Sequence, residues 1–167
     1  MHEGAQMLCD VEERGFCVDL GHVRRKQVEL RELVRGLGRD FLATDFGRGW
    51  RRSCGEFNMD SNAQLSNYLF RVLKLPPVRA TEKGHPSVDE DSLLALGIPE
   101  VSQLLRIRKL NKCLTTYLDN LVRETTDEDP VTGRGTLRPF FHLLTTITYR
   151  SSSSAVNFQN QPTRDPE

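Results

Sequence analysis

The stretch at residues 148–162 carries the side chains best suited to contact a nucleic acid. It is rich in hydroxyl and amide groups and contains one arginine, Arg150. A packed protein core does not need this composition. Arginine and amide side chains exchange hydrogen bonds with base edges, and hydroxyl groups bond phosphate and sugar oxygens. The composition therefore indicates a surface that reads the edges and backbone of a nucleic acid.

This stretch resembles the motif that opens the polymerase domain of family A DNA polymerases, the family of bacterial DNA polymerase I and many phage replicases. The family pattern is roughly T-G-R-x-S-S, a short spacer, then N-[LF]-Q-N-x-P-x-R. The departures are Tyr149 for glycine, Val156 for proline and Gln161 for an aliphatic residue, and a tyrosine resists backbone shapes that a glycine permits. The matching residues are Thr148, Arg150, Ser152, Ser153, Asn157, Phe158, Gln159, Asn160, Pro162 and Arg164.

Three earlier segments strengthen the resemblance, which covers about residues 8 to 164. Residues 13–19 resemble the turn that leads into the polymerase thumb. Residues 57–65 have every element of the family pattern F-N-[apolar]-x-S-x-x-Q-L. Residues 108–117 match R-x-L-x-K-x-x-[ST]-T-Y, which in the family lies along the minor groove of the primer–template duplex.

The resemblance implies that this chain contacts primer–template DNA. Arg150 would reach the minor groove near the primer end, and Asn157 and Gln159 would touch template or primer. Arg108, Lys112 and Thr116 would hold backbone phosphates and sugars. The expected DNA-binding residues are Arg108, Lys112, Thr115, Thr116, Arg150, Ser152, Ser153, Asn157, Gln159, Asn160 and Arg164.

The resemblance assigns no catalytic residue and no metal ligand to this chain. In this family, nucleotide transfer needs two metal-bound carboxylates in the palm and a lysine-bearing fingers helix. Those motifs lie downstream of residue 167. We therefore expect Mg²⁺ in the palm of a parent enzyme, with palm and fingers supplied by the same parent chain or by a second chain. The acidic runs at residues 89–91 and 127–129 are explained by helix capping and solvation.

Composition limits the remaining possibilities. Lysine plus arginine (23) equals aspartate plus glutamate (23), which argues against a globally basic protein but allows a basic stripe. The four cysteines form no C-x-x-C pair, so a zinc site or a disulfide framework is not expected. Without a membrane-length apolar run or a signal peptide, we expect the cytoplasm of a bacterium or phage-infected cell, and no membrane partner.

The predicted fold class is mainly α with a small β element. We expect a long antiparallel helical hairpin, the polymerase thumb, with short tip helices, followed by a strand or hairpin that enters the palm. The division is residues 1–19 as lead-in, 20–126 as thumb with its tip at about 57–97, and 127–167 as palm entry. The predicted helices cover residues 5–14, 20–43, 61 to about 73, 87–96 and 99–124, and a strand or hairpin covers 137–147.

Several local predictions depend on side-chain pattern. Ser61 with Gln64, and Ser87 with Glu90, predict capping boxes. The helix predicted from residue 61 should have an apolar face formed by Leu65, Leu69, Val72 and Leu73.

Two features leave alternatives open. Residues 45–56 are predicted to form a loop that is longer than its counterpart in the bacterial enzymes. Within this loop, Trp50 either stacks on a base or anchors the loop to the rest of the protein. The stripe of Arg24, Arg31, Arg35 and Arg39 either contacts phosphates or pairs with Glu29 and Glu32.

Two alternatives remain to the interpretation that the chain is the DNA-binding part of a polymerase. The chain could be one half of a split polymerase, or a non-catalytic helical interaction module derived from a polymerase. A companion reading frame with the palm carboxylates would favour the split enzyme. Absence of salt-sensitive DNA binding would favour the interaction module.

Overall fold

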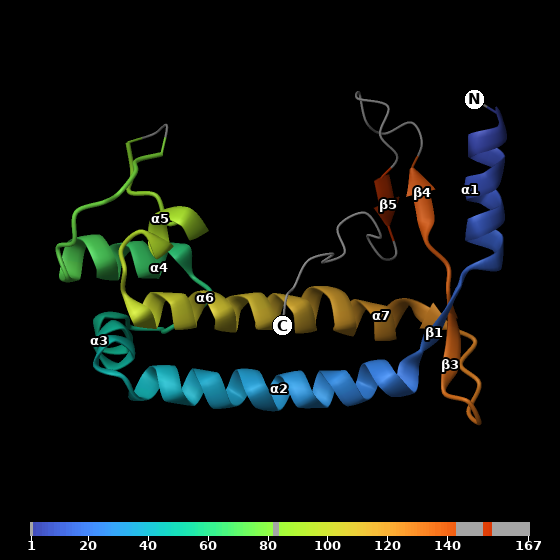
Figure 1. Ribbon diagram of the computed structural model, residues 1–167, viewed down its shortest axis with the longest axis horizontal. Coiled ribbons are helices and arrows are strands. Elements are labelled where there is room, and N and C mark those ends of the chain that lie inside the picture. Colours follow the sequence, from blue (N-terminus) through green and yellow to red (C-terminus); the bar gives the residue numbers. More distant parts are fainter. Residues whose placement is uncertain (1, 82–83, 143–151, 155–167) are drawn as a thin grey trace. The chain divides into compact units, whose positions relative to one another are not determined.

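The computed structural model describes residues 2–81, 84–142 and 152–154 (Figure 1). It confirms a mainly α-helical chain with a small amount of antiparallel β-structure. In chain order the elements are α1 (His2–Arg14), β1 (Phe16–Asp19), α2 (Leu20–Ala43), α3 (Asp45–Ser53), α4 (Asn62–Ser66), the π-helix η1 (Asn67–Val72), α5 (Glu90–Leu94), α6 (Pro99–Lys112), the π-helix η2 (Cys113–Leu118), α7 (Asp119–Glu124), β2 (Thr125–Thr126), β3 (Arg134–Leu137), β4 (Phe140–His142) and β5 (Ser152–Ser154).

The chain forms two compact units. Unit 1 combines residues 1–29 with 112–167, and unit 2 is the continuous segment 30–111. Helix α2 begins in unit 1 and ends in unit 2. Helix α6 lies in unit 2 except for its last residue, Lys112, which is assigned to unit 1. The functional division into lead-in, thumb and palm entry stays a prediction. In the part of the chain that the structure describes, no helix is both long and apolar enough to cross a lipid bilayer.

Unit 1 is built around a three-stranded antiparallel sheet in the order β1-β3-β2. Phe16 and Thr125 lie on either side of Leu137, so β1 and β2 are the two edge strands of this sheet. Gly15 makes the turn before β1 with φ +70°, and a Cβ there would lie 2.6 Å from the Thr136 methyl group. Glycine is therefore required at this close approach. The separate pair β4–β5 is also antiparallel.

Helix α2 begins where the sequence predicts, because two groups satisfy its first amides. The Asp19 carboxylate accepts a hydrogen bond from the His22 amide at 2.8 Å. The Gly133 carbonyl accepts from the amides of Leu20 and Gly21 at 2.9 and 3.3 Å. The N-terminus of α2 is thus capped both by its own sequence and by the loop before β3. Further along, the Gln27 side chain donates to Asp119 in α7 at 2.7 Å.

Unit 2 has one hydrophobic core, to which the second half of α2 and the first turns of α6 both contribute. These two helical segments run antiparallel within the unit (Figure 1). This part of the predicted helical hairpin is confirmed. The buried residues of the core are Phe41, Trp50, Leu65, Tyr68, Leu69, Leu93, Val101, Leu104 and Ile107.

The prediction of a loop at residues 45–56 is wrong, because most of this segment is the helix α3. Thr44 caps α3, its hydroxyl accepting from the Gly47 amide at 3.0 Å. Trp50 is fully buried, its ring 5.0 Å from that of Phe57 and 6.2 Å from that of Phe41. Base stacking by Trp50 is therefore excluded in this structure, and the alternative that it anchors the segment is confirmed.

The predicted apolar face of the helix after Ser61 is only half right. Leu65 and Leu69 are buried, but Val72 and Leu73 are 49% and 41% exposed, and Tyr68 is buried instead. The cause is the switch from α4 to the π-helix η1, where hydrogen bonds span five residues and each residue turns through a smaller angle. The face that an α-helical period predicts is therefore displaced along η1.

The predicted cap at Ser87 is also wrong by two residues. The N-cap of α5 is Asp89, whose carboxylate accepts from the Ser92 amide at 2.7 Å, and Ser87 donates its hydroxyl to that carboxylate. The stretch predicted as one helix over residues 99–124 is helical throughout, but η2 interrupts it as a π-helix. Pro99 occupies the first helical position, as predicted.

Candidate nucleic-acid interface

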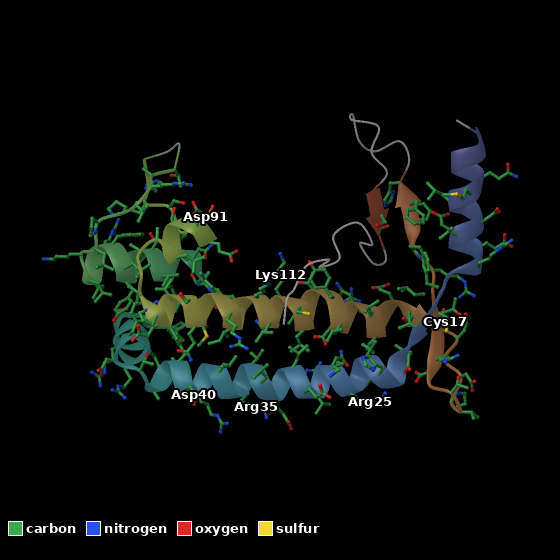
Figure 2. All side chains as sticks on the ribbon, in the orientation of Figure 1. Cys17, Arg25, Arg35, Asp40, Asp91 and Lys112 are labelled. Carbon is green, nitrogen blue, oxygen red and sulfur yellow. The ribbon has the colours of Figure 1, made fainter. Side chains whose placement is uncertain are left out.

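Three of the predicted DNA-contacting residues form a polar stretch where α6 passes into η2. Lys112 is the last residue of α6 (Figure 2), and Thr115 and Thr116 lie in η2. All three are exposed. Four residues make close to one full turn in a π-helix as well as in an α-helix, so Lys112 and Thr116 lie on the same side. The Asn120 side chain donates a hydrogen bond to the backbone carbonyl of Thr116 at 2.6 Å, and the Thr116 hydroxyl takes no part in this bond.

Arg108 occupies a different environment, although it lies in the same helix α6. Its side chain is half-buried, and its Nε donates to the Met59 carbonyl at 2.9 Å. Its Nη1 donates to the Asn62 side chain at 2.9 Å, and its Nη2 is buried and has no partner among the residues that the structure describes. Burial lowers the pKa of the guanidinium, and the negative charge of Asp60 opposes that shift. The structure thus gives Arg108 an intramolecular role that the sequence pattern did not indicate.

The segment that Arg108 holds is itself organised by amide side chains. The Gln64 side chain donates to the Glu56 carbonyl at 2.7 Å and accepts from the Asn58 amide at 2.9 Å. The Asn58 side chain in turn accepts from the Asp60 amide at 2.9 Å, and Asn111 of α6 donates to the Asp60 carboxylate at 3.2 Å.

These contacts explain part of the family pattern in residues 57–65. The backbone N–H of Gln64 donates to the hydroxyl of Ser61 at 3.3 Å, so Ser61 is the cap as predicted. The Gln64 side chain does not complete a capping box, because it bonds the preceding turn instead. The asparagine and glutamine of the pattern therefore have a structural purpose in this chain.

Of the polar C-terminal stretch, the structure describes only β5. Its residues pair with β4, Ser152 opposite His142 and Ser153 opposite Phe141. Ser153 is buried, and the Ser154 hydroxyl lies 2.9 Å from the His142 ring nitrogen Nε2. The other residues predicted to contact DNA in this stretch lie outside the described residues: Arg150, Asn157, Gln159, Asn160 and Arg164.

The acidic run 127–129 is engaged in interactions that organise the loop before β3. Arg138 donates to Asp127 at 2.6 Å, and Arg24 donates to Glu128 at 2.5 and 2.8 Å. These bonds lower the pKa of both carboxyls. The Thr132 hydroxyl lowers the pKa of Asp129 in the same way. Arg24 therefore pairs with Glu128, which is distant in sequence. One of the two alternatives for the arginine stripe was pairing with Glu29 and Glu32, and Arg24 does not form that pair.

The second acidic run, 89–91, begins at the N-cap of α5. Hydrogen bonds from Ser87 and from the Ser92 amide lower the pKa of Asp89 to about 2. The expectation that capping accounts for this run is met at Asp89. Within residues 2–81, 84–142 and 152–154, no group of three or more histidine, cysteine or acidic side chains could hold a metal ion.

Comparison with known proteins identifies relatives of this chain. Residues 44–167 match the family model of DNA polymerase family A. A thermostable DNA polymerase I from Thermus filiformis is 36% identical over 165 residues, which are 97% of this chain and 18% of that protein. DNA polymerase I from Geobacillus stearothermophilus is 32% identical over 96% of this chain and 17% of that protein. The chain thus spans less than a fifth of these curated relatives.

A solved structure agrees with the sequence relatives. The POL domain of Pol1 from M. smegmatis, in complex with DNA primer-template and dNTP, superposes with a TM-score of 0.77. The match has 26% sequence identity and covers 96% of this chain and 26% of that chain.

Proposed function

The chain belongs to DNA polymerase family A, and from this membership we propose that it is the part of a template-directed DNA polymerase that binds primer–template DNA. The observation that carries the proposal is the likeness, over 96% of this chain, to a polymerase domain solved with primer–template and dNTP. Replication or repair in the cytoplasm of a bacterium or phage-infected cell would be its setting.

In this proposal Lys112, Thr115 and Thr116 contact the DNA backbone. An exposed ammonium group attracts phosphates without base preference, and nearby hydroxyls can bond phosphate or sugar oxygens. Arg108 supports this surface indirectly, because two of its N–H groups already bond protein oxygens. Ser152 and the polar residues from Arg150 to Arg164 would extend the contact toward the primer end, whereas the burial of Ser153 in β5 argues against the contact predicted for it.

Chemistry belongs to other parts of the proposed enzyme. Two-metal nucleotidyl transfer requires carboxylates that would hold two metal ions, and those ions would stabilise the attacking and leaving oxygens. We propose that a palm and fingers, in the same parent chain or in a second chain, supply these groups and the Mg²⁺. The 167-residue chain alone is therefore expected to bind a primer–template but not to extend the primer.

The test measures binding of a fluorescein-labelled primer–template to the 167-residue chain by fluorescence anisotropy at several salt concentrations. We expect affinity to fall as salt rises, because bound phosphates release counterions. Lys112→Ala should weaken binding, reduce the slope of log K against log salt by about one, and leave the free energy of unfolding unchanged. Binding without salt dependence, or no binding, would contradict the proposal and favour the helical interaction module.

Arg108→Ala is the matched comparison on the same helix. It should lower the free energy of unfolding by about 1–3 kcal/mol, because the Met59 carbonyl and the Asn62 side chain lose a half-buried partner. Urea unfolding followed by Trp50 fluorescence measures this, since Trp50 is the single tryptophan of the sequence. If Arg108→Ala leaves stability unchanged but weakens DNA binding as Lys112→Ala does, the predicted direct contact is right and the supporting role is wrong.

A further inference from the structure

Helix α3 has a strongly one-sided composition. Three arginines and one aspartate are its charged residues. Phe46, Gly47 and Trp50 face the core of unit 2, with Gly47 and Trp50 buried. The remaining side of the helix is polar and exposed.

The attachment of α3 to unit 2 leaves it little freedom to reorient. A Cβ on Gly47 would lie 2.2 Å from the Phe41 carbonyl oxygen, and one on Gly49 would lie 2.3 Å from the Tyr68 hydroxyl. The backbone of α3 therefore packs directly on its neighbours. The Trp50 ring also stacks on Tyr68, with centroids 6.5 Å apart. Side chains on the outer face of α3 are consequently presented in a fixed direction.

Most polar side chains of α3 take part in its own structure. Arg48 donates to the Ala43 carbonyl and to Asp45, both at 2.7 Å. Ser53 donates to the Trp50 carbonyl at 2.7 Å. Arg51 and Arg52 differ, because both residues are exposed and neither side chain has a hydrogen-bond or ion-pair partner within the described ranges.

We propose that Arg51 and Arg52 of α3 bind backbone phosphates of duplex DNA, in addition to the predicted contacts of Lys112, Thr115 and Thr116. This inference rests on the proposed function, which supplies DNA as the polyanion. Planar guanidinium groups match phosphate oxygens in bidentate geometry. Arginine is also common in protein interfaces, but there it usually lies beside buried apolar or aromatic anchors, and no large hydrophobic residue of α3 is exposed. The chemistry of this face therefore fits a nucleic-acid backbone better than a protein.

A purely structural explanation also exists for these arginines. Cations in the last turn of a helix interact favourably with its dipole. Arg14 and Arg123 hold the same last-turn position in α1 and α7. They therefore provide a control pair that matches Arg51 and Arg52 in charge and in helical position.

The experiment compares the 167-residue chain with three double variants in salt-dependent anisotropy titrations of a labelled primer–template. Arg51→Gln with Arg52→Gln should weaken binding several-fold and reduce the slope of log K against log salt by about two. Arg51→Lys with Arg52→Lys should keep the wild-type slope, because the charges remain. Arg14→Gln with Arg123→Gln should also keep a slope near that of the wild type.

The outcomes separate this inference from the proposed function. If the wild-type chain shows no salt-dependent DNA binding, both are overturned. If Lys112→Ala weakens binding while the glutamine variant of α3 binds as the wild type does, only the α3 surface is overturned, and an acidic protein becomes the candidate occupant. The α3 surface is also overturned if the lysine variant or the control variant loses as much DNA affinity as the glutamine variant. The loss of affinity would then not depend on the positive charge of Arg51 and Arg52.

Discussion

At the scale of single residues, close packing around α3 gives the sharpest prediction. Glycine inside a helix is normally less stable than alanine by about 0.5–1 kcal/mol. Gly49→Ala should nevertheless destabilise unit 2 by about 1–3 kcal/mol, because its Cβ would overlap the Tyr68 hydroxyl. Tyr68 is 4% exposed and stacked on Trp50, so its ring cannot move aside without disturbing the core. Urea unfolding followed by Trp50 fluorescence measures the change.

Two further variants control this prediction. Gly36→Ala in α2 places its Cβ in open space and should stabilise the chain by about 0.5–1 kcal/mol. Tyr68→Phe removes the clashing oxygen, so it should recover part of the loss caused by Gly49→Ala. A stabilising Gly49→Ala, or no recovery in the double variant, would mean that α3 does not pack on Tyr68 as described.

Residue roles were predictable from the sequence where the partner is local. The start of α2 at residue 20 was predictable, because its cap Asp19 bonds an amide only three residues away. Arg108 could not be assigned its internal role, because its partners lie 46 and 49 residues earlier in the chain. The predicted DNA contacts of Lys112 and Thr116 stay predictions, supported by exposure and family resemblance.

At the scale of elements, long helices with regular apolar spacing were predictable and short ones were not. The bounds of α2 follow directly from its pattern. Helix α3 was missed because glycines and arginines interrupt the periodicity, while its helical state is maintained by Thr44 and by burial of Trp50. The π-helices were missed because a hydrogen-bond shift leaves no mark in residue pattern. Asp89 replaced Ser87 as a cap because both residue types cap helices well.

The loop between β2 and β3 predicts a pH dependence for unit 1. Hydrogen bonds from arginine lower the pKa of Asp127 and of Glu128 in the folded state. A carboxyl whose folded pKa lies below its unfolded value contributes stability above the unfolded pKa, and that contribution is lost as pH falls through the folded pKa. Lowering the pH from 6 to 3 crosses the ordinary pKa values of 4.5 for glutamate and 3.8 for aspartate. Thermal unfolding followed by circular dichroism should therefore show a midpoint that decreases over this range.

The control is the variant Asp127→Asn with Glu128→Gln. It should be less stable than the wild type at pH 6 and approach the wild type at pH 3, so that its own pH dependence is weaker. Because both ion pairs are solvent-accessible, 1 M salt should reduce the difference at pH 6. An identical pH dependence in variant and wild type would show that these pairs do not contribute.

At the scale of the whole molecule, the two units differ in how the chain builds them. Unit 1 needs both ends of the sequence, because β1 pairs with β3 across more than a hundred residues. Unit 2 is one continuous segment that contains its entire buried cluster. The sequence pattern predicted the elements of both units but not this grouping, since strand pairing between distant segments has no local signal.

We therefore expect an excised segment of residues 30–111 to fold alone, whereas residues 1–29 alone should not form a stable structure. The excised segment retains Phe41, Trp50, Leu104 and the other residues of its core, and Trp50 fluorescence should report a buried ring that urea exposes cooperatively. Leu104→Ala in this segment should cost about 2–5 kcal/mol and abolish the transition, because small domains have little stability in reserve. An exposed Trp50 in the unmutated segment would mean that the core of unit 2 depends on unit 1, and that the chain folds as a single cooperative body.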